Sequence, residues 1–295
     1  MKQAGIIFSV MTLLLVFLLA LPLVVNARSP WQWQQSLRVD RSGDSMYMPS
    51  AVAFDAAADR YYVVDTGRNR LVSFDRDGRL LSAFTADEQL RAPFDMVRLG
   101  NGRLWVVEKG RNSLTMIEPA ARKIEPHVLT DGQQQIFPDR IAARGNELFL
   151  LDRASGDVVG LGHDLNVVQR FHCSDCRSGI SDFVLHRGGV LALAGRDGKI
   201  LYFAADGSLQ QTYRLGEEVD FAVSLAVGPD GYIYVLDRHQ NSVLVYDDNG
   251  RFRYRFLTTG HAVGRVYFAR QLRFDPWGNL CVVDEGNGRV EVFAR

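Results

Sequence analysis

Residues 223–256 read VSLAVGPDGYIYVLDRHQNSVLVYDDNGRFRYRF and decide the fold. The stretch contains four short runs rich in Val, Ile, Leu, Tyr and Phe. Turn sequences separate the first run from the second at Pro229-Asp230-Gly231, and the third from the fourth at Asp248-Asn249-Gly250. Asp-Gly and Asn-Gly pairs supply the positive φ angles that tight hairpins need. The stretch is therefore predicted to form a four-stranded antiparallel meander.

The fourth run alternates between arginine and aromatic residues, in the order Arg251, Phe252, Arg253, Tyr254, Arg255 and Phe256. Successive side chains of a β-strand point to opposite faces of the sheet. This run is therefore predicted to bury its aromatic face and to expose its arginines.

The same unit recurs along the chain. The copies align on the acid that closes the second strand, with a glycine in its place in the fourth copy: Asp65, Glu108, Asp152, Gly195, Asp237 and Asp284. Successive positions differ by 43, 44, 43, 42 and 47 residues. A period of ~40–50 residues with four strands is typical of β-propellers, because one small sheet cannot bury both its faces alone. Six copies predict an all-β, six-bladed propeller.

Motifs inside the repeat resemble the NHL repeat. In the first copy they stand as Pro49-Ser50-Ala51-Val52, Val63-Val64-Asp65, Asn69-Arg70-Leu71 and Asp75-Arg76-Asp77-Gly78. The resemblance covers about residues 49–295 and implies the six-bladed fold. NHL propellers include protein-binding, RNA-binding and enzymatic domains, so the resemblance is specific for fold and not for function.

The chain begins with an uncharged apolar run at residues 6–25, preceded by Lys2 and followed by Val25-Asn26-Ala27. A secretory signal has an apolar core of ~7–15 residues and a spanning helix needs ~20. We expect a signal peptide cleaved after Ala27, with an uncleaved membrane anchor as the alternative. Both place the propeller, residues 28–295, outside the cytoplasm, in the periplasm or secreted.

Charge excludes one class of partner. The chain carries 34 basic and 34 acidic side chains, so no field of one sign attracts nucleic acid. Six repeats fill residues 28–295, which leaves no room for a second domain, and we expect a monomer.

An early strand is predicted to close the ring. Trp31, Trp33, Leu37 and Val39 share one parity, which predicts a strand with a buried face. The sixth repeat has only three strands before the chain ends, so this strand is expected to be its outer, fourth one. We favour core packing for the tryptophans over a sugar-binding platform.

Two sets of residues are expected on the face formed by the loops between second and third strands and by the connections between blades, here called the loop face. The first is an arginine rim that suits a carboxylate, a phosphate or an acidic partner, since no turn requires arginine: Arg68, Arg70, Arg111, Arg153 and Arg238. The acids beside them are expected to accept hydrogen bonds from loop amides.

The second set, the channel ring, lies at the mouth of the inner strands: Ala51, Asp95, Arg140, Asp182, Ser224 and Gln271. Inner-strand residues there are usually small or apolar, so Asp95, Arg140 and Asp182 in neighbouring blades are informative. We favour an ion-pair cluster that plugs the channel. The alternatives are a polar pocket and a Ca²⁺ site built on the two carboxylates.

Cysteines occur as Cys173-Ser-Asp-Cys176 and as Cys281 within a strand. In an oxidising compartment the pair is expected to form a structural disulfide. A redox couple or a metal site that includes His172 stays open as an alternative. Cys281 is expected to be a buried thiol.

Catalytic motifs are weak. Some NHL-like enzymes, the amidating lyases, hold zinc with three histidines, and the histidines of this chain do not match that pattern. We expect a non-catalytic scaffold that binds a protein or an envelope polymer through the loop face. The alternative is a lyase or lactone hydrolase with Ca²⁺ or Zn²⁺ in the channel.

Overall fold

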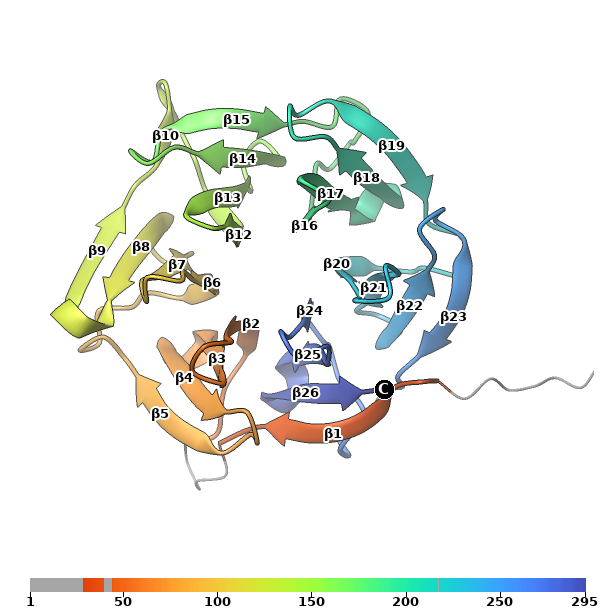
Figure 1. The fold of residues 1–295 in the computed structure, drawn as a ribbon, viewed down its shortest axis with the longest axis horizontal. Coiled ribbons are helices and arrows are strands. Elements are labelled where there is room, and N and C mark those ends of the chain that lie inside the picture. The colour runs from red at the N-terminus through yellow and green to blue at the C-terminus, as the bar shows by residue number, and fades with distance from the viewer. Residues whose placement is uncertain (1–28, 40–43, 217) are drawn as a thin grey trace, which may run out of the picture. The chain divides into compact units, whose positions relative to one another are not determined.

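A computed structural model describes residues 29–39, 44–216 and 218–295. The unit Trp31–Arg295 is a closed ring of six four-stranded antiparallel sheets, so the predicted six-bladed propeller is confirmed (Figure 1). The expected signal or anchor at residues 6–25, with Ala27, lies outside the described residues. No helix within the described ranges is long and apolar enough to cross a membrane.

Each blade is a meander whose first strand lies innermost (Figure 1). The first two blades contain β2 (Pro49–Asp55), β3 (Arg60–Asp65), β4 (Arg70–Asp75) and β5 (Leu80–Phe84), then β6 (Pro93–Arg98), β7 (Leu104–Glu108), β8 (Ser113–Glu118) and β9 (Lys123–His127). The third contains β12 (Pro138–Arg144), β13 (Glu147–Asp152), β14 (Asp157–Leu161) and β15 (Val167–Phe171), after a short hairpin of β10 (Thr130–Asp131) and β11 (Gln134–Gln135).

The last three blades follow the same order. The fourth contains β16 (Asp182–His186), β17 (Gly189–Ala194), β18 (Lys199–Phe203) and β19 (Leu209–Arg214). The fifth contains β20 (Ala222–Val227), β21 (Ile233–Asp237), β22 (Ser242–Tyr246) and β23 (Phe252–Phe256), and the sixth contains β24 (Gln271–Phe274), β25 (Leu280–Asp284) and β26 (Arg289–Ala294) with β1 (Gln32–Leu37). Four 3-10 turns complete the elements: η1 (Thr66–Arg68), η2 (Pro119–Ala121), η3 (Gly195–Asp197) and η4 (Glu285–Asn287).

The fifth blade is the predicted meander. Its turn glycines Gly231 and Gly250 have φ angles of 80° and 75°, as the hairpins require. The expected aromatic face of its outer strand is only partly buried, because Phe256 is 7% exposed but Phe252 is 44% exposed. A register shift opposite Tyr246 displaces the start of the strand from the alternating pattern.

Closure of the ring is also confirmed. β1 pairs with β26 and completes the sixth sheet from the other end of the chain (Figure 1). Trp31 and Leu37 are buried in the cores on either side of this sheet. The prediction for Trp33 was wrong: a bulge between Trp33 and Gln35 leaves its ring 43% exposed, and its Nε1 donates to Glu291 Oε2 at 2.8 Å.

Candidate functional site

The acids that close the second strands hold the loop face together. The carboxylate of Asp237 accepts hydrogen bonds from the amides of Asp220 at 2.6 Å and His239 at 3.0 Å, which join the blade connection to the loop. Asp65, Glu108, Asp152 and Asp284 make the corresponding bonds to Tyr47, Arg91, Phe137 and Tyr267. Their hydrogen-bonding capacity is thus used by the fold, which directs attention to the basic side chains beside them.

Polar side chains of the channel ring link neighbouring blades. Each such side chain accepts a hydrogen bond from a backbone amide of the next blade, one residue after the ring position there. The pairs are Asp95 with the amide of Ile141 at 3.2 Å, Asp182 with Leu225 at 3.0 Å, Ser224 with Leu272 at 3.1 Å and Gln271 with Val52 at 3.0 Å. These bonds satisfy inner-strand amides that would otherwise face the channel unpaired.

An ion-pair cluster crosses the channel at this level. Arg140 Nε lies 3.9 Å from Asp182 Oδ1, and the guanidinium of Arg273 lies 3.9 Å from both Asp182 Oδ2 and Asp95 Oδ2. Burial raises the pKa of Asp95, and the charges of Arg140 and Arg273 oppose that rise. Two guanidinium groups facing two carboxylates do not fit a divalent cation. Within the described ranges no group of three or more His, Cys, Asp or Glu side chains is placed to hold a metal ion.

Beside the channel mouth, the loop face is hollowed by a pocket of about 420 Å³, here called the arginine pocket. Its basic lining consists of Arg140, Arg153, Arg196, Arg238 and Arg270, and its apolar lining includes Phe94, Leu151, Ile180, Phe221 and Val223. Asp139 is the acidic residue of the lining. Guanidinium groups beside an apolar wall can bind an oxyanion that carries an apolar body.

The structure divides the predicted binding residues. Arg140, Arg153 and Arg238 line the pocket, whereas Asp95, Asp182 and Gln271 lie in the channel cluster below it. The other three arginines of the expected rim do not line the pocket: Arg68, Arg70 and Arg111.

Each of these three arginines pairs within its own loop region, Arg68 and Arg70 by hydrogen bonds and Arg111 by an ion pair. Arg70 is 6% exposed, and its Nε donates to Asp65 at 2.7 Å. Arg68 Nε donates to the carbonyl of Ser45 at 2.6 Å, and Arg111 Nε lies 3.4 Å from Glu108. Their bonds are therefore made to the fold.

Three pocket residues were missed from the sequence, namely Asp139, Arg196 and Arg270, and so was Lys109, which pairs with Asp139. For Lys109 and Arg196 a signal exists in the repeat alignment, at the position directly after the aligned acid. Four consecutive copies carry a cation there: Lys109, Arg153, Arg196 and Arg238. Asp139 and Arg270 each precede a channel-ring residue, where the copies show no common residue type.

Cations gather around Phe94 at the inner end of the pocket. Lys109 Nζ lies 3.2 Å from the centre of the ring, and the guanidinium carbons of Arg270 and Arg140 lie 4.7 and 5.0 Å from it. Lys109 pairs with Asp139. Burial, helped by the charges of Arg140 and Arg270, lowers the pKa of Lys109 to about 8. Positive charge is therefore in excess here.

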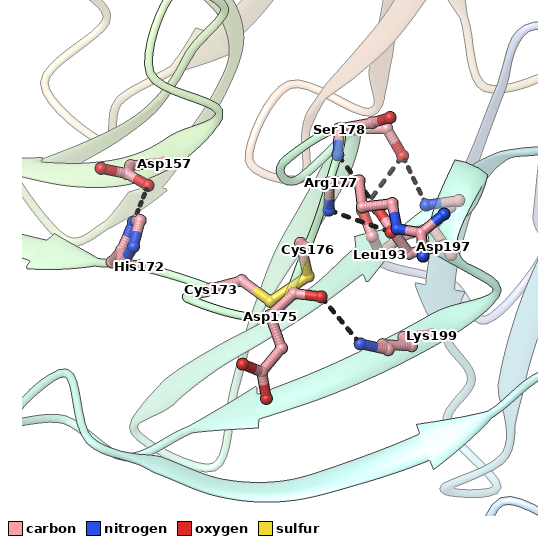
Figure 2. The surroundings of a disulfide bond; sticks show 12 residues. Asp157, His172, Cys173, Asp175, Cys176, Arg177, Ser178, Leu193, Asp197 and Lys199 are labelled. Atoms are coloured by element: carbon pink, nitrogen blue, oxygen red, sulfur yellow. Dashed lines mark hydrogen bonds and ion pairs between the residues drawn. A yellow bond between two sulfur atoms is a disulfide. The ribbon is translucent and has the colours of Figure 1, made fainter.

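The predicted disulfide between Cys173 and Cys176 is present (Figure 2). After it, the amides of Arg177 and Ser178 donate to the carboxylate of Asp197 at 3.0 and 3.2 Å. Ser178 and the following Gly179 line the pocket. The disulfide loop is thus fixed to the fourth blade where it forms the wall.

Gly179 packs closely against the loop of the third blade. It has a φ of 68°, and a Cβ on it would lie 2.6 Å from the Cα of Gly156. No side chain can be accommodated at that distance, so the sequence keeps glycine at both positions of this pocket wall.

The structure also shows the surroundings of His172 and Cys281. The side chain of His172 bonds Asp157, with Nδ1 2.7 Å from Oδ1 (Figure 2). Cys281 is a buried free thiol, as predicted.

Replacing Cys173 and Cys176 by Ser is expected to lower the free energy of unfolding by about 2 kcal/mol, because the loop that they close is short. Chemical denaturation of wild type and double variant measures this difference. Alkylation of both residues by a maleimide in native, unreduced protein would contradict the structural role.

Comparison with solved structures supports the fold. A streptogramin B lyase superposes with a TM-score of 0.66 at 11% identity, covering 90% of this chain and 97% of that one. A virginiamycin B lyase from Staphylococcus aureus gives 0.64 at 11% identity, with 90% and 99% covered. A gluconolactonase from Xanthomonas campestris gives 0.67 at 15% identity, with 89% and 98% covered. At such identities the likeness extends to the propeller fold alone.

No protein-family model and no curated protein matches the chain. The NHL label is therefore not confirmed, although the six-bladed architecture that it implied is.

Proposed function

We propose that the arginine pocket is the working site and that it binds a small molecule bearing a carboxylate or phosphate group. The observation that carries this proposal is the convergence of five guanidinium groups from four blades on one pocket. Arginine presents a planar fork of donors that matches both oxyanions. The proposal replaces the expected rim with a concave site.

Charge balance supports an anionic ligand. Arg238 and Arg270 share the single carboxylate of Glu285, each at 3.0 Å. Arg153 and Arg196 form no ion pair within the described ranges, and Arg153 donates only to the side-chain carbonyl of Asn112, at 3.3 Å. An anion would neutralise charge that the fold leaves unbalanced.

The shape of the site favours a small molecule over a protein or an envelope polymer. Ligand pockets typically have volumes of about 300–1,000 Å³ and combine an apolar wall with a few convergent polar groups. The arginine pocket, at about 420 Å³, has both features. The non-catalytic scaffold expected from the sequence is thus less well supported than a small-molecule site.

An enzyme is the second candidate. The three superposed proteins are named as lyases and a gluconolactonase, and this chain offers a proton-transfer pair, Lys109 and Asp139, at the inner end of the pocket. An amine whose pKa lies near 8 can both accept and donate a proton near neutral pH. In this proposal Asp139 exchanges a proton with the substrate. Lys109 exchanges that proton with Asp139.

The disulfide also supports an extracytoplasmic location, because such bonds persist in oxidising compartments. We propose a periplasmic or secreted protein on this basis.

A paired ligand series tests the proposed function. Thermal shift and calorimetry with carboxylates and phosphate esters, each beside its neutral amide or alcohol analogue, should show binding of anions only. The effect should weaken as salt is raised, because salt screens the exposed part of the site. Equal binding of the neutral analogues would overturn the proposal.

For the enzymatic candidate, Asp139→Asn should abolish turnover of a bound anion, followed by mass spectrometry, while keeping its binding. If wild type binds the ligand but does not change it chemically, the enzymatic candidate is wrong and the pocket only binds.

A further inference from the structure

Arg140 departs from the rule that the channel ring otherwise follows. Four of the six ring positions carry a side chain that accepts the inner-strand amide of the next blade. At the third blade that amide belongs to Phe183, and Arg140 has no acceptor atom to offer it. Ala51 has none either, but alanine is small and adds no charge. Bonding the amide of the next blade therefore does not explain the guanidinium at this position, although its charge faces Asp182.

Arg140 also has unused hydrogen-bond donors, and in the same ring Asp182 Oδ1 is likewise without a partner among the described residues. The side chain of Arg140 is 5% exposed, and its Nε and Nη1 have no hydrogen-bond partner among those residues. A buried unpaired donor costs about 1–3 kcal/mol, and more when it is charged. Because Nε faces Asp182 Oδ1, Nη1 is the donor for which a partner from outside the fold has to be sought.

The nearest carboxylate does not supply that partner. Asp182 Oδ2 already accepts from Ser224 Oγ at 2.5 Å and from the amide of Leu225 at 3.0 Å. Its Oδ1 lies 3.9 Å from Arg140 Nε, which is beyond hydrogen-bond distance. Asp182 also faces Arg273, so it offsets part of the charge of Arg140 without satisfying its donors.

A second guanidinium completes the arrangement. Arg270 lines the same pocket, its Nε has no partner among the described residues, and its guanidinium, like that of Arg140, lies over the ring of Phe94. Burial and the neighbouring charge of Arg140 lower the pKa of Arg270. Two guanidinium groups near the same ring, each with a donor that the described residues leave unused, can bind one shared oxyanion.

We propose that Arg140 and Arg270 form an inner oxyanion subsite at the mouth of the channel, which receives the carboxylate or phosphate of the ligand. This inference rests on the proposed function and adds the orientation of the ligand. The anionic group enters first, and the apolar body remains against Ile180, Phe221 and Val223 nearer the opening. The ligand class is therefore an amphiphilic oxyanion with its charge at one end.

The chain itself suggests the variant that tests this subsite. Gln271 occupies the ring position of the sixth blade and accepts the amide of Val52 at 3.0 Å. Arg140→Gln should accept the amide of Phe183 in the same way while removing the buried charge. We expect its melting temperature to lie at or below that of wild type, because Asp182 and Asp95 lose one of the two guanidinium groups that face them.

Binding should weaken in the folded variant. With benzoate and phenyl phosphate as probes in calorimetry, Arg140→Gln should raise the Kd by roughly 30-fold or more, because one member of a buried charge pair is lost. The preference of wild type for benzoate over neutral benzamide should disappear. Arg68→Gln, on the loop face but outside the pocket, is the matched control and should bind as wild type does.

A second variant covers the case in which Arg140→Gln does not fold. Arg140→Lys keeps the charge but lacks the planar fork, so it should weaken the binding of both benzoate and inorganic phosphate, by less than Arg140→Gln does. Unchanged affinity in either variant would overturn the subsite and leave the proposed function standing. Failure of every anionic probe to bind wild type would overturn both.

Discussion

Without residues 28–40 the protein is expected to melt about 15 °C lower than the full chain. The deletion removes β1 and with it three buried side chains, Trp31, Leu37 and Val39. Burial of a large apolar side chain contributes about 1.5–3 kcal/mol, so roughly 6 kcal/mol is lost. For a domain of this size each kcal/mol shifts the melting temperature by about 2–4 °C.

The deletion also exposes an edge. β26 would lose its antiparallel partner along the whole register from Val290 to Ala294, and an unpaired edge favours aggregation. Differential scanning calorimetry and light scattering would record both effects. Equal melting of truncated and full chains would show that β1 does not close the ring.

Single substitutions in β1 distinguish the loss of its packing from the effect of shortening the chain. Leu37→Ala should lower the free energy of unfolding by about 3 kcal/mol, because Leu37 is fully buried. Trp33→Ala should lower it less, since the Trp33 ring is 43% exposed and its main contribution is one hydrogen bond to Glu291. The reverse order would mean that the bulge in β1 is absent in solution.

The repeat made the architecture predictable from the sequence. Turn pairs such as Asn249-Gly250 act locally, and a constant period requires each copy to take the same place in the ring, so blade number and closure followed. The bulge at Trp33 was not predictable in this way. It depends on the register between β1 and β26, which lie at opposite ends of the chain.

The site was predictable only in part, because residue type does not decide which way an arginine turns. Arg70 and Arg238 both follow the acid that closes the second strand of their blade. Arg70 follows the acid by five residues and turns back onto Asp65, whereas Arg238 follows its acid directly and faces the pocket. The distinguishing signal is position within the repeat.

Reversing the charge of Arg153 and Arg196 is expected to weaken anion binding by more than about 100-fold while the fold persists. Each Arg→Glu change replaces an attraction by a repulsion, and like charges placed together cost several kcal/mol. The fold should persist because both side chains are exposed and neither forms an ion pair within the described ranges. Arg238 is left unchanged, because its guanidinium bonds the carbonyl of Phe268 and the carboxylate of Glu285.

A control of equal charge separates the pocket from the net charge of the molecule. Arg68→Glu with Arg79→Glu changes the net charge by the same amount. Arg68 lies on the loop face outside the pocket, and Arg79 lies in the turn between β4 and β5, at the opposite ends of the strands. Calorimetry with phenyl phosphate at low salt should show binding to this control and none to Arg153→Glu with Arg196→Glu. Equal loss in both proteins would mean that long-range charge, and not the arginine pocket, attracts the anion.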